Sequence, residues 1–362
     1  MLSTLVRSVA GLVLAAVIAG CAGKAGEAPS TLPAASFLSD RTGIRRIALT
    51  NALGLVPARH LNRARSWMRP DAGKQWLLYV SDGASGTVDV YNYRVKTGKL
   101  YGQITGLSFP YGQCLDRRGN VYVVDNDTAK IYEYAHGGTT PIATADDRYG
   151  YPIGCSVDRT TGDVAVANFD SLGSGSGGVV VFTGGLSGNQ TNYTDPNLYH
   201  LWPPGYDRSG NLFVQGTDYS GYPKLAELPA GSSAFTLLGG LTIAFPGAVS
   251  WDGSYITVTD QDYQYYYTTM IYRVTVSGSA VTVVGSTHLT DDCYPRANWM
   301  VAVQPFIGGT TRARNAVVAG NLNCPHRQNF FNYTTGGNPK RSLPAEISAD
   351  APYGQAVSPP KS

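Results

Sequence analysis

The stretch that decides the fold of this 362-residue chain reads Asp116-Arg117-Arg118-Gly119-Asn120-Val121-Tyr122-Val123-Val124-Asp125. A polar turn leads here into a run of β-branched and aromatic residues. Asp at the start of a turn accepts hydrogen bonds from the backbone amides that follow, and Gly at its end adopts the left-handed conformation. The apolar run favours a β-strand. We therefore expect a tight reversal between two strands at this point.

The same pattern returns farther along the chain, at residues 158–168 and 207–215. Aromatic–proline pairs precede the copies and recur every 42 to 51 residues: Phe109-Pro110, Tyr151-Pro152, Trp202-Pro203, Phe245-Pro246 and Tyr294-Pro295. Further short β-runs follow each copy, as at residues 130–134 and 140–144. Four short strands per repeat is the content of a propeller blade. The sequence therefore predicts an all-β propeller with four-stranded antiparallel blades.

The two ends of the repeat region complement each other. Pro352-Tyr353-Gly354-Gln355 matches Pro110-Tyr111-Gly112-Gln113, the inner strand of a blade, whereas the run at residues 76–82 matches a second strand and has no inner strand before it. We expect the C-terminal strand to complete the N-terminal blade, because closure removes an exposed sheet edge. Inner strands near residues 110, 152, 203, 246, 297 and 352 predict six blades, with seven as the alternative.

The N-terminus has the features of an export signal. Arg7 precedes an apolar run from Val9 to Ala19 that is too short to span a membrane, and the run ends in Ile18-Ala19-Gly20-Cys21. This ending resembles the lipobox of bacterial lipoproteins, which implies lipid on Cys21, a cell-envelope location and, because Asp does not follow the cysteine, the outer membrane. The alternative is an ordinary signal peptide that happens to contain a cysteine.

The domain boundaries follow from composition. We expect a signal peptide at 1–20, a flexible tether at 21–40, a basic N-terminal arm at 41–75, the propeller at 76–358 and a short tail at 359–362. The arm either lies against anionic headgroups or caps the propeller. A net charge of +3 gives nucleic-acid binding no electrostatic support, so we expect no nucleic-acid partner.

Four cysteines remain after Cys21, namely Cys114, Cys155, Cys293 and Cys324. An exported protein meets an oxidising compartment, and an even count without a CxxC spacing favours disulfides over a metal site. Three pairings are open by counting. We predict Cys293–Cys324, because both flank one blade on the same face, and Cys114–Cys155, because both lie on adjacent inner strands.

One face of the predicted propeller carries most of the candidate binding residues. The connection into each inner strand and the turn after each second strand meet there. The aromatic set is Tyr111, Tyr151, Trp202, Phe245, Tyr294 and Tyr353; the polar set is Asp82, Asp125, Asn126, Asp127, Asn168, Asp170, Asp218, Asp260, Asp262, Asn321 and Asn323. Such a face suits a ligand or a hard cation such as calcium or magnesium. The alternative is that the polar residues build turns and the rings pack between blades.

The turn-and-strand pattern from Pro110 to Asp125 resembles the NHL-type propeller repeat. The resemblance covers residues 76–358. Relatives with that repeat include binding scaffolds, the regucalcin and gluconolactonase group, and the streptogramin lyases. The lactonase resemblance implies a cation held by Asn126, Asn168 and Asp218, but the chain has no Glu on an inner strand to complete the set. The lyase resemblance implies a His and a Glu near bound magnesium. His136 and His200 fall outside the second-strand turns, whereas His326 is better placed, close to Cys324 on the predicted face.

Two functions follow, and no catalytic residue is assigned. The favoured one is a binding scaffold at the cell envelope for a protein, peptide or glycan. The alternative is a divalent-cation-dependent hydrolase or lyase, acting at the mouth of the central channel. The tether, the aromatic mouth and the lack of a complete catalytic set favour the first. A Tyr-rich loop at residues 261–267 resembles binding surfaces that use rigid amphipathic rings, and its alternative is a hairpin folded over a neighbouring blade.

Overall fold

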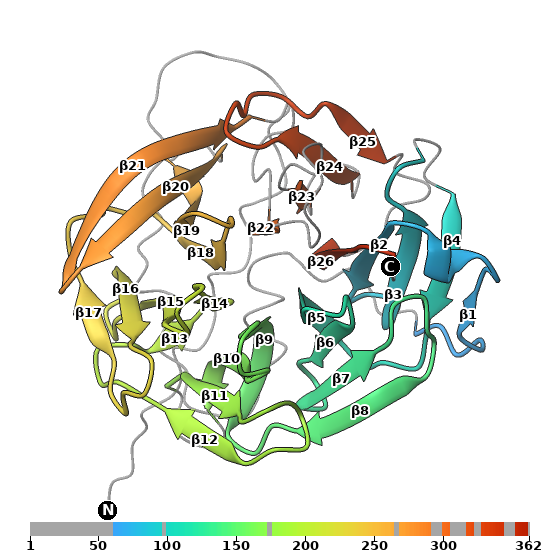
Figure 1. The fold of residues 1–362 in the computed structure, drawn as a ribbon, viewed down its shortest axis with the longest axis horizontal. Helices are drawn as coiled ribbons and strands as arrows, with labels where there is room; N and C mark the ends of the chain where they lie inside the picture. Colours follow the sequence, from blue (N-terminus) through green and yellow to red (C-terminus); the bar gives the residue numbers. More distant parts are fainter. Residues whose placement is uncertain are drawn as a thin grey trace, which may run out of the picture.

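The computed structural model describes residues 61–95, 99–171, 176–263, 268–290, 299–304, 316–321, 327–343 and 352–360. Their strands form six sheets arranged as blades around a central axis (Figure 1). Strand pairing within the blades is antiparallel, so the predicted all-β propeller is confirmed. In this part of the chain the sole helical segment is the 3₁₀ turn Ala72–Lys74, and none has the length and apolarity needed to cross a bilayer.

Each blade runs outward from an inner strand. Blade one contains β26 (Pro352–Ser358), β2 (Leu77–Asp82), β3 (Thr87–Asn92), β4 (Leu100–Ile104) and β1 (Trp67–Met68); blade two β5 (Pro110–Leu115), β6 (Val121–Asp125), β7 (Lys130–Tyr134) and β8 (Pro141–Asp146); blade three β9 (Gly150–Val157), β10 (Val164–Ser171), β11 (Gly178–Phe182) and β12 (Gln190–Tyr193). Blade four contains β13 (His200–Leu201), β14 (Gly205–Tyr206), β15 (Leu212–Thr217), β16 (Pro223–Leu228) and β17 (Thr236–Leu238); blade five β18 (Pro246–Trp251), β19 (Ile256–Tyr263), β20 (Thr268–Ser277) and β21 (Ala280–Leu289); blade six β22 (Trp299–Gln304), β23 (Ala316–Asn321), β24 (Arg327–Asn332) and β25 (Arg341–Leu343).

The ring closes as predicted, through the C-terminal strand. β26 pairs with β2 in antiparallel register, with Tyr79 opposite Ala356 and Leu77 opposite Ser358. The inner edge of β2 is therefore covered by a strand that follows it by 270 residues in the chain, counted from Asp82 to Pro352. Figure 1 shows the last strand lying against the first blade.

The end of the predicted N-terminal arm packs on the outside of blade one. β1 adds to the outer strand β4, with Trp67 opposite Gln103. Asn62 extends this contact, since its amide bonds the carbonyl of Ser85 and its side chain donates to Gln103 at 3.0 Å. Residues 1–60, which include the predicted signal peptide, Cys21 and the tether, lie outside the described residues.

The polar turns have the chemistry that the repeat predicted. In blade two, Asp116 Oδ1 accepts the backbone amides of Arg118 and Asn120, both at 2.8 Å. In blade four, Asp207 Oδ1 accepts the backbone amides of the residues two and four positions after it in the same way. Gly119 closes its turn with a φ of 80°, a conformation that side-chain-bearing residues avoid. The strand that follows is buried throughout, from Val121 to Asp125, because each blade is covered by a neighbour on both faces.

Glycines that follow the proline of an inner strand let neighbouring inner strands approach each other closely. A Cβ atom on Gly112 would lie 2.6 Å from Gly154 Cα and still closer to the Ile153 carbonyl. One on Gly354 would lie 2.8 Å from Gly112 Cα. No real Cβ atom tolerates such distances, so glycine is required where neighbouring inner strands meet backbone to backbone.

Candidate functional site

One face of the propeller carries the predicted candidate residues, and we call it the proline face. On it a proline at or near the start of the inner strand lies directly opposite a polar residue at or near the end of the second strand. The register gives Pro110 opposite Asp125, Pro152 opposite Asn168, and Pro246 opposite Asp260. The predicted meeting of these connections and turns on a single face is therefore present in the structure.

Two carboxylates of the predicted polar set hold the backbone of this face. Asp125 accepts the amide of Ser108 at 2.7 Å and the amide of Phe109 at 2.9 Å. Asp260 makes the same pair of bonds in blade five, to Ala244 at 2.9 Å and Phe245 at 3.1 Å. Both carboxylates are buried. Each one fixes the connection that leads into the inner strand of its own blade, which is the structural role that the turn alternative anticipated.

The three residues proposed for a cation each have a different partner. Asn126 donates to the Pro152 carbonyl at 3.1 Å, and Asn168 donates to Asp147 at 2.9 Å. Asp218 pairs with Lys224 at 3.1 Å. Among the residues that the structure describes, no group of three or more His, Cys, Asp and Glu side chains is arranged to hold a metal ion. The contacts therefore give the cation site no support beyond the sequence pattern.

Asp147 is a buried carboxyl group that the sequence analysis missed. It accepts the amides of Tyr149 at 2.9 Å and Gly150 at 3.2 Å in addition to the side chain of Asn168. Burial raises the pKa of Asp147, and the hydrogen bonds from Tyr149, Asn168 and Gly150 oppose this rise. In blade three, Asp147 thus holds the connection that Asp125 and Asp260 hold in their blades.

Members of the predicted aromatic set form two groups of ring contacts within one hydrophobic cluster. Tyr111 stacks on Tyr353 with ring centroids 4.5 Å apart, and Phe109 contacts both rings. Trp202 meets Phe245 edge to face at 5.6 Å. Tyr111, Trp202 and Tyr353 are buried, while Tyr151 and Phe245 are half-buried. The three buried rings present little surface to a ligand, and their contacts are those of packing residues between inner strands.

Other candidates of the face have positions that the structure does not define. Tyr294, Asn323, Cys293, Cys324 and residues 264–267 of the Tyr-rich loop lie outside the described residues. The backbone of Asp262 and Asn321 belongs to β19 and β23, but their side chains are not described.

His200 lies on the proline face at the seam between blades three and four. Its ring stacks on Phe169, with centroids 4.2 Å apart, and Tyr199 meets it edge on at 4.5 Å. Its Nδ1 lies 3.0 Å from Asp170 Oδ1 and 3.2 Å from the Phe169 carbonyl. The sequence pattern set this histidine aside because it falls outside the second-strand turns. Its position two residues before Trp202-Pro203 was the signal that placed it on this face.

Among the described residues of the face, the turn between β15 and β16 carries the most exposed aromatic side chains. We call residues Asp218–Tyr222 the tyrosine turn. Its Tyr219 and Tyr222 are 62% and 67% exposed, the two highest values among the large hydrophobic side chains of the described residues. Tyr219 contacts Tyr199 edge to face, with centroids 5.2 Å apart. The tyrosine turn is thereby joined to the His200 cluster.

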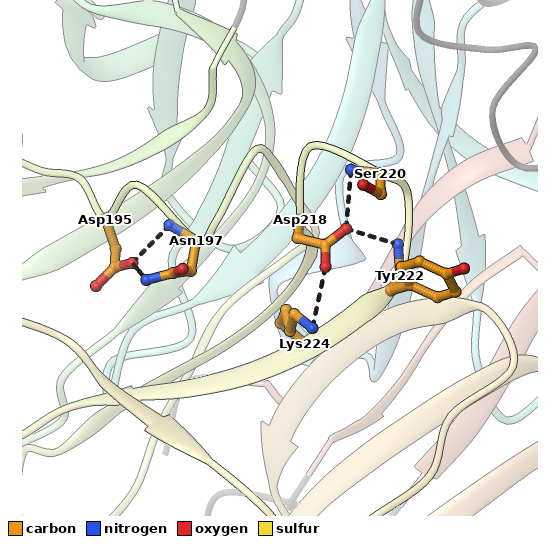
Figure 2. Close-up of polar contacts among 6 residues, drawn as sticks. All are labelled: Asp195, Asn197, Asp218, Ser220, Tyr222 and Lys224. Atoms are coloured by element: carbon orange, nitrogen blue, oxygen red, sulfur yellow. Dashed lines mark hydrogen bonds and ion pairs between the residues drawn. The ribbon is translucent and has the colours of Figure 1, made fainter.

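Asp218 makes the tyrosine turn rigid (Figure 2). One carboxylate oxygen accepts the amides of Ser220 at 2.9 Å and Tyr222 at 3.0 Å, and the other pairs with Lys224. Burial raises the pKa of Asp218, but the Tyr222 amide, Lys224 and the Ser220 amide outweigh it and hold the pKa below its usual value. Gly221, with a φ of 87°, completes the reversal.

The connection before β13 supplies further polar groups beside this turn. The amide of Tyr199 bonds the carbonyl of Thr217 at 2.6 Å, which joins the connection to the end of β15. Earlier in the same connection, Asp195 accepts two hydrogen bonds from Asn197, at 2.8 Å from its amide and at 3.0 Å from its side chain. Figure 2 shows this pair and the tyrosine turn in one view.

A disulfide joins the inner strands of blades two and three. Cys114 and Cys155 are bonded, with Cα atoms 5.5 Å apart, so this predicted pairing is confirmed. The Cys293–Cys324 pairing stays a prediction.

Comparisons with known proteins bear on the fold. No known family model matches the sequence, and no curated protein matches it. A protein of unknown function from Bacteroides caccae matches in structure with a TM-score of 0.55 at 9% identity, over 78% of this chain and 99% of that chain. The β-propeller domain of Cps50 (Swd1) from Myceliophteria thermophila matches with a TM-score of 0.47 at 14% identity, over 79% of this chain and 87% of that chain. At such identities the likeness to the Bacteroides protein shows the fold alone, and function has to be argued from the residues of the proline face.

Proposed function

We propose that this protein is a lipoprotein of the cell envelope, anchored through Cys21 in the outer membrane, whose propeller binds a partner through the proline face. The observation that carries the proposal is the tyrosine turn, because two exposed aromatic rings stand there on a fixed backbone. Rigid rings at an exposed position bind partners at a low cost in conformational entropy. The residues Ile18-Ala19-Gly20-Cys21 and the Cys114–Cys155 disulfide support export.

The relation to NHL-type propellers is part of the same proposal, carried by the pattern from Pro110 to Asp125. The contacts of the candidate cation ligands give a cation-dependent hydrolase or lyase no support. Asn126, Asn168 and Asp218 each bond a different group, and Asp125 and Asp260 are engaged by backbone amides. None of these contacts favours chemistry at the channel mouth.

Site-specific photo-crosslinking in the intact envelope tests the binding face. A photoreactive phenylalanine analogue at position 222 is expected to yield a crosslinked partner. The matched control is position 255, where Tyr255 is 37% exposed on a turn of the opposite face and Asp252 accepts its amide at 2.7 Å, much as Asp218 accepts that of Tyr222. Equal crosslinking at positions 222 and 255, or none at 222, would contradict the proposal.

Membrane anchoring is tested separately, through Cys21. The Cys21→Ser variant is expected to lose incorporation of labelled fatty acid and to move from the membrane fraction to the soluble fraction, because several acyl chains supply the anchoring energy. Fractionation of wild-type and variant cells measures this. A variant that stays in the membrane and still carries label would refute lipidation at Cys21.

A further inference from the structure

We propose that the tyrosine turn is the binding site for a neutral oligosaccharide, an inference that rests on the binding function proposed above. Tyr219 and Tyr222 supply the stacking surfaces, and the polar groups around them supply the hydrogen bonds.

The amount of exposed aromatic surface argues for a small ligand. A fully buried aromatic side chain removes about 150–250 Å² from water. At exposures of 62% and 67%, Tyr219 and Tyr222 together offer about 200–300 Å². A stable protein–protein interface buries about 800 Å² on each partner around an apolar core. Two rings fall well short of such a core, but they match the apolar C–H faces of sugar rings.

The surroundings of the rings are polar rather than apolar. Ser220 follows Tyr219 in the sequence and is exposed, as is Asn197 of the neighbouring connection. Figure 2 shows both polar side chains together with Tyr222. The Asn197 side chain donates to Asp195, which leaves its own carbonyl oxygen outside that bond. Hydroxyl, amide and carboxylate groups exchange hydrogen bonds readily with sugar hydroxyls. Ser220, Asn197 and Asp195 form a polar rim, whereas an apolar rim would favour a hydrophobic partner.

The charge within the turn is compensated, which favours a neutral ligand, because Asp218 is paired with Lys224 at 3.1 Å and receives two backbone amides. In the neighbouring connection Asp195 is bonded to the neutral Asn197 and keeps its negative charge, which disfavours an anionic ligand. The ion pair therefore leaves no unopposed charge of either sign within the turn. A sulfated, phosphorylated or uronic-acid-rich glycan would find no cationic group there that is free of a partner.

The site is formed before any ligand arrives. The three contacts of Asp218 fix the turn, and Tyr199 supports the ring of Tyr219 from the side. A preorganised site loses less entropy on binding, which matters for a ligand that makes few contacts. Two separate rings also provide two stacking positions, so we expect an oligosaccharide to bind more tightly than a monosaccharide.

The test uses the purified full chain in detergent and a panel of neutral and acidic oligosaccharides on an array, followed by calorimetry with the best neutral oligosaccharide. Tyr222→Ala and Tyr219→Ala are each expected to weaken binding about tenfold or more. Tyr222→Phe keeps the ring and is expected to retain most of the affinity. Tyr255→Ala, on the opposite face, is the matched control and is expected to bind like the wild type. Unchanged thermal unfolding of each variant excludes loss of the fold.

The outcomes separate this inference from the proposed function. Binding of acidic oligosaccharides alone, or neutral binding that is insensitive to Tyr219→Ala and Tyr222→Ala, overturns the inference. Absence of any oligosaccharide binding together with a protein crosslinked at position 222 also overturns it, and leaves the proposed binding function standing. Absence of both oligosaccharide binding and crosslinking at position 222 would overturn the inference and the proposed binding function together.

Discussion

At the scale of single residues, the buried carboxyl group of Asp89 on β3 makes the stability of blade one depend on pH. Its oxygens accept hydrogen bonds from Gln103 at 2.8 Å, Thr87 at 3.2 Å and Tyr91 at 3.3 Å. Burial raises the pKa of Asp89 to about 6, an effect that Gln103 opposes and the nearby Asp82 reinforces. The carboxylate at neutral pH therefore destabilises the folded state relative to the protonated form.

The substitution Asp89→Asn is therefore expected to stabilise the protein at neutral pH. With a folded pKa of about 6 and an ordinary value of 3.8, the folded state binds the proton more tightly. The stability gained from binding a proton at Asp89 is fully present below about pH 4 and is lost as the pH rises through about 6. The variant should remove this dependence and raise the free energy of unfolding at pH 7.5 by on the order of 1–3 kcal/mol. Urea unfolding at pH 4.5 and pH 7.5 measures it.

The control for this prediction is Asp146→Asn. Asp146 is exposed at the outer strand β8, where it pairs with Lys130, so its loss should change stability by less than about 1 kcal/mol. A wild-type protein whose stability does not fall between pH 4.5 and pH 7.5 would show that Asp89 does not titrate in this range.

At the scale of strands, close packing around the axis depends on glycine. Gly112→Ala is expected to destabilise the protein by about 2–4 kcal/mol, because its Cβ atom would meet the backbone of Ile153 and Gly154 and not a movable side chain. Gly73→Ala is the control, since nothing lies within 4 Å of its Cβ position. Thermal unfolding of both variants measures the difference, and equal melting temperatures would contradict the described approach of β5 and β9.

The disulfide between these same strands is expected to contribute stability of its own. It closes a loop across a sequence separation of 41 residues. The double variant Cys114→Ser, Cys155→Ser should lose about 2–4 kcal/mol of unfolding free energy, as measured by denaturant titration without reductant. A loss below about 1 kcal/mol would mean that packing between the blades holds these strands without the bond.

A thiol count on the unfolded, non-reduced protein tests the second predicted pairing. With Cys21 lipidated and both pairings formed, no thiol reacts. Two reactive thiols would leave Cys114–Cys155 as the sole bond and refute Cys293–Cys324.

At the scale of the whole molecule, we expect closure by β26 to make unfolding cooperative, because β26 covers the inner edge of β2. Truncation after residue 351 removes the strand that covers β2, so we expect an aggregated product without a sharp unfolding transition. Truncation after residue 360 keeps β26 and should leave the melting temperature unchanged. Size-exclusion chromatography and thermal unfolding of the two products decide the point. A folded, monomeric protein that lacks β26 would show that closure is dispensable.

The sequence by itself determined the repeat, the turns and the closure, because these depend on local chemistry. Asp116 and Gly119 form their turn whatever surrounds it, and the match between residues 352–355 and 110–113 identifies the closing strand. The Cys114–Cys155 pairing followed from blade order alone.

Only the tertiary structure decided the roles of the candidate residues, because a side chain's exposure and partners come from other blades. Tyr111 and Tyr222 are both tyrosines on the same face, yet Tyr111 is covered by Tyr353 from the far end of the chain and Tyr222 is open. Asp125 is the last residue of the second strand β6, and Asp218 follows the second strand β15. Asp125 holds the connection before β5, whereas Asp218 fixes an exposed turn. The local sequence predicts neither difference, because each one depends on which residues of other strands and blades pack against the side chain.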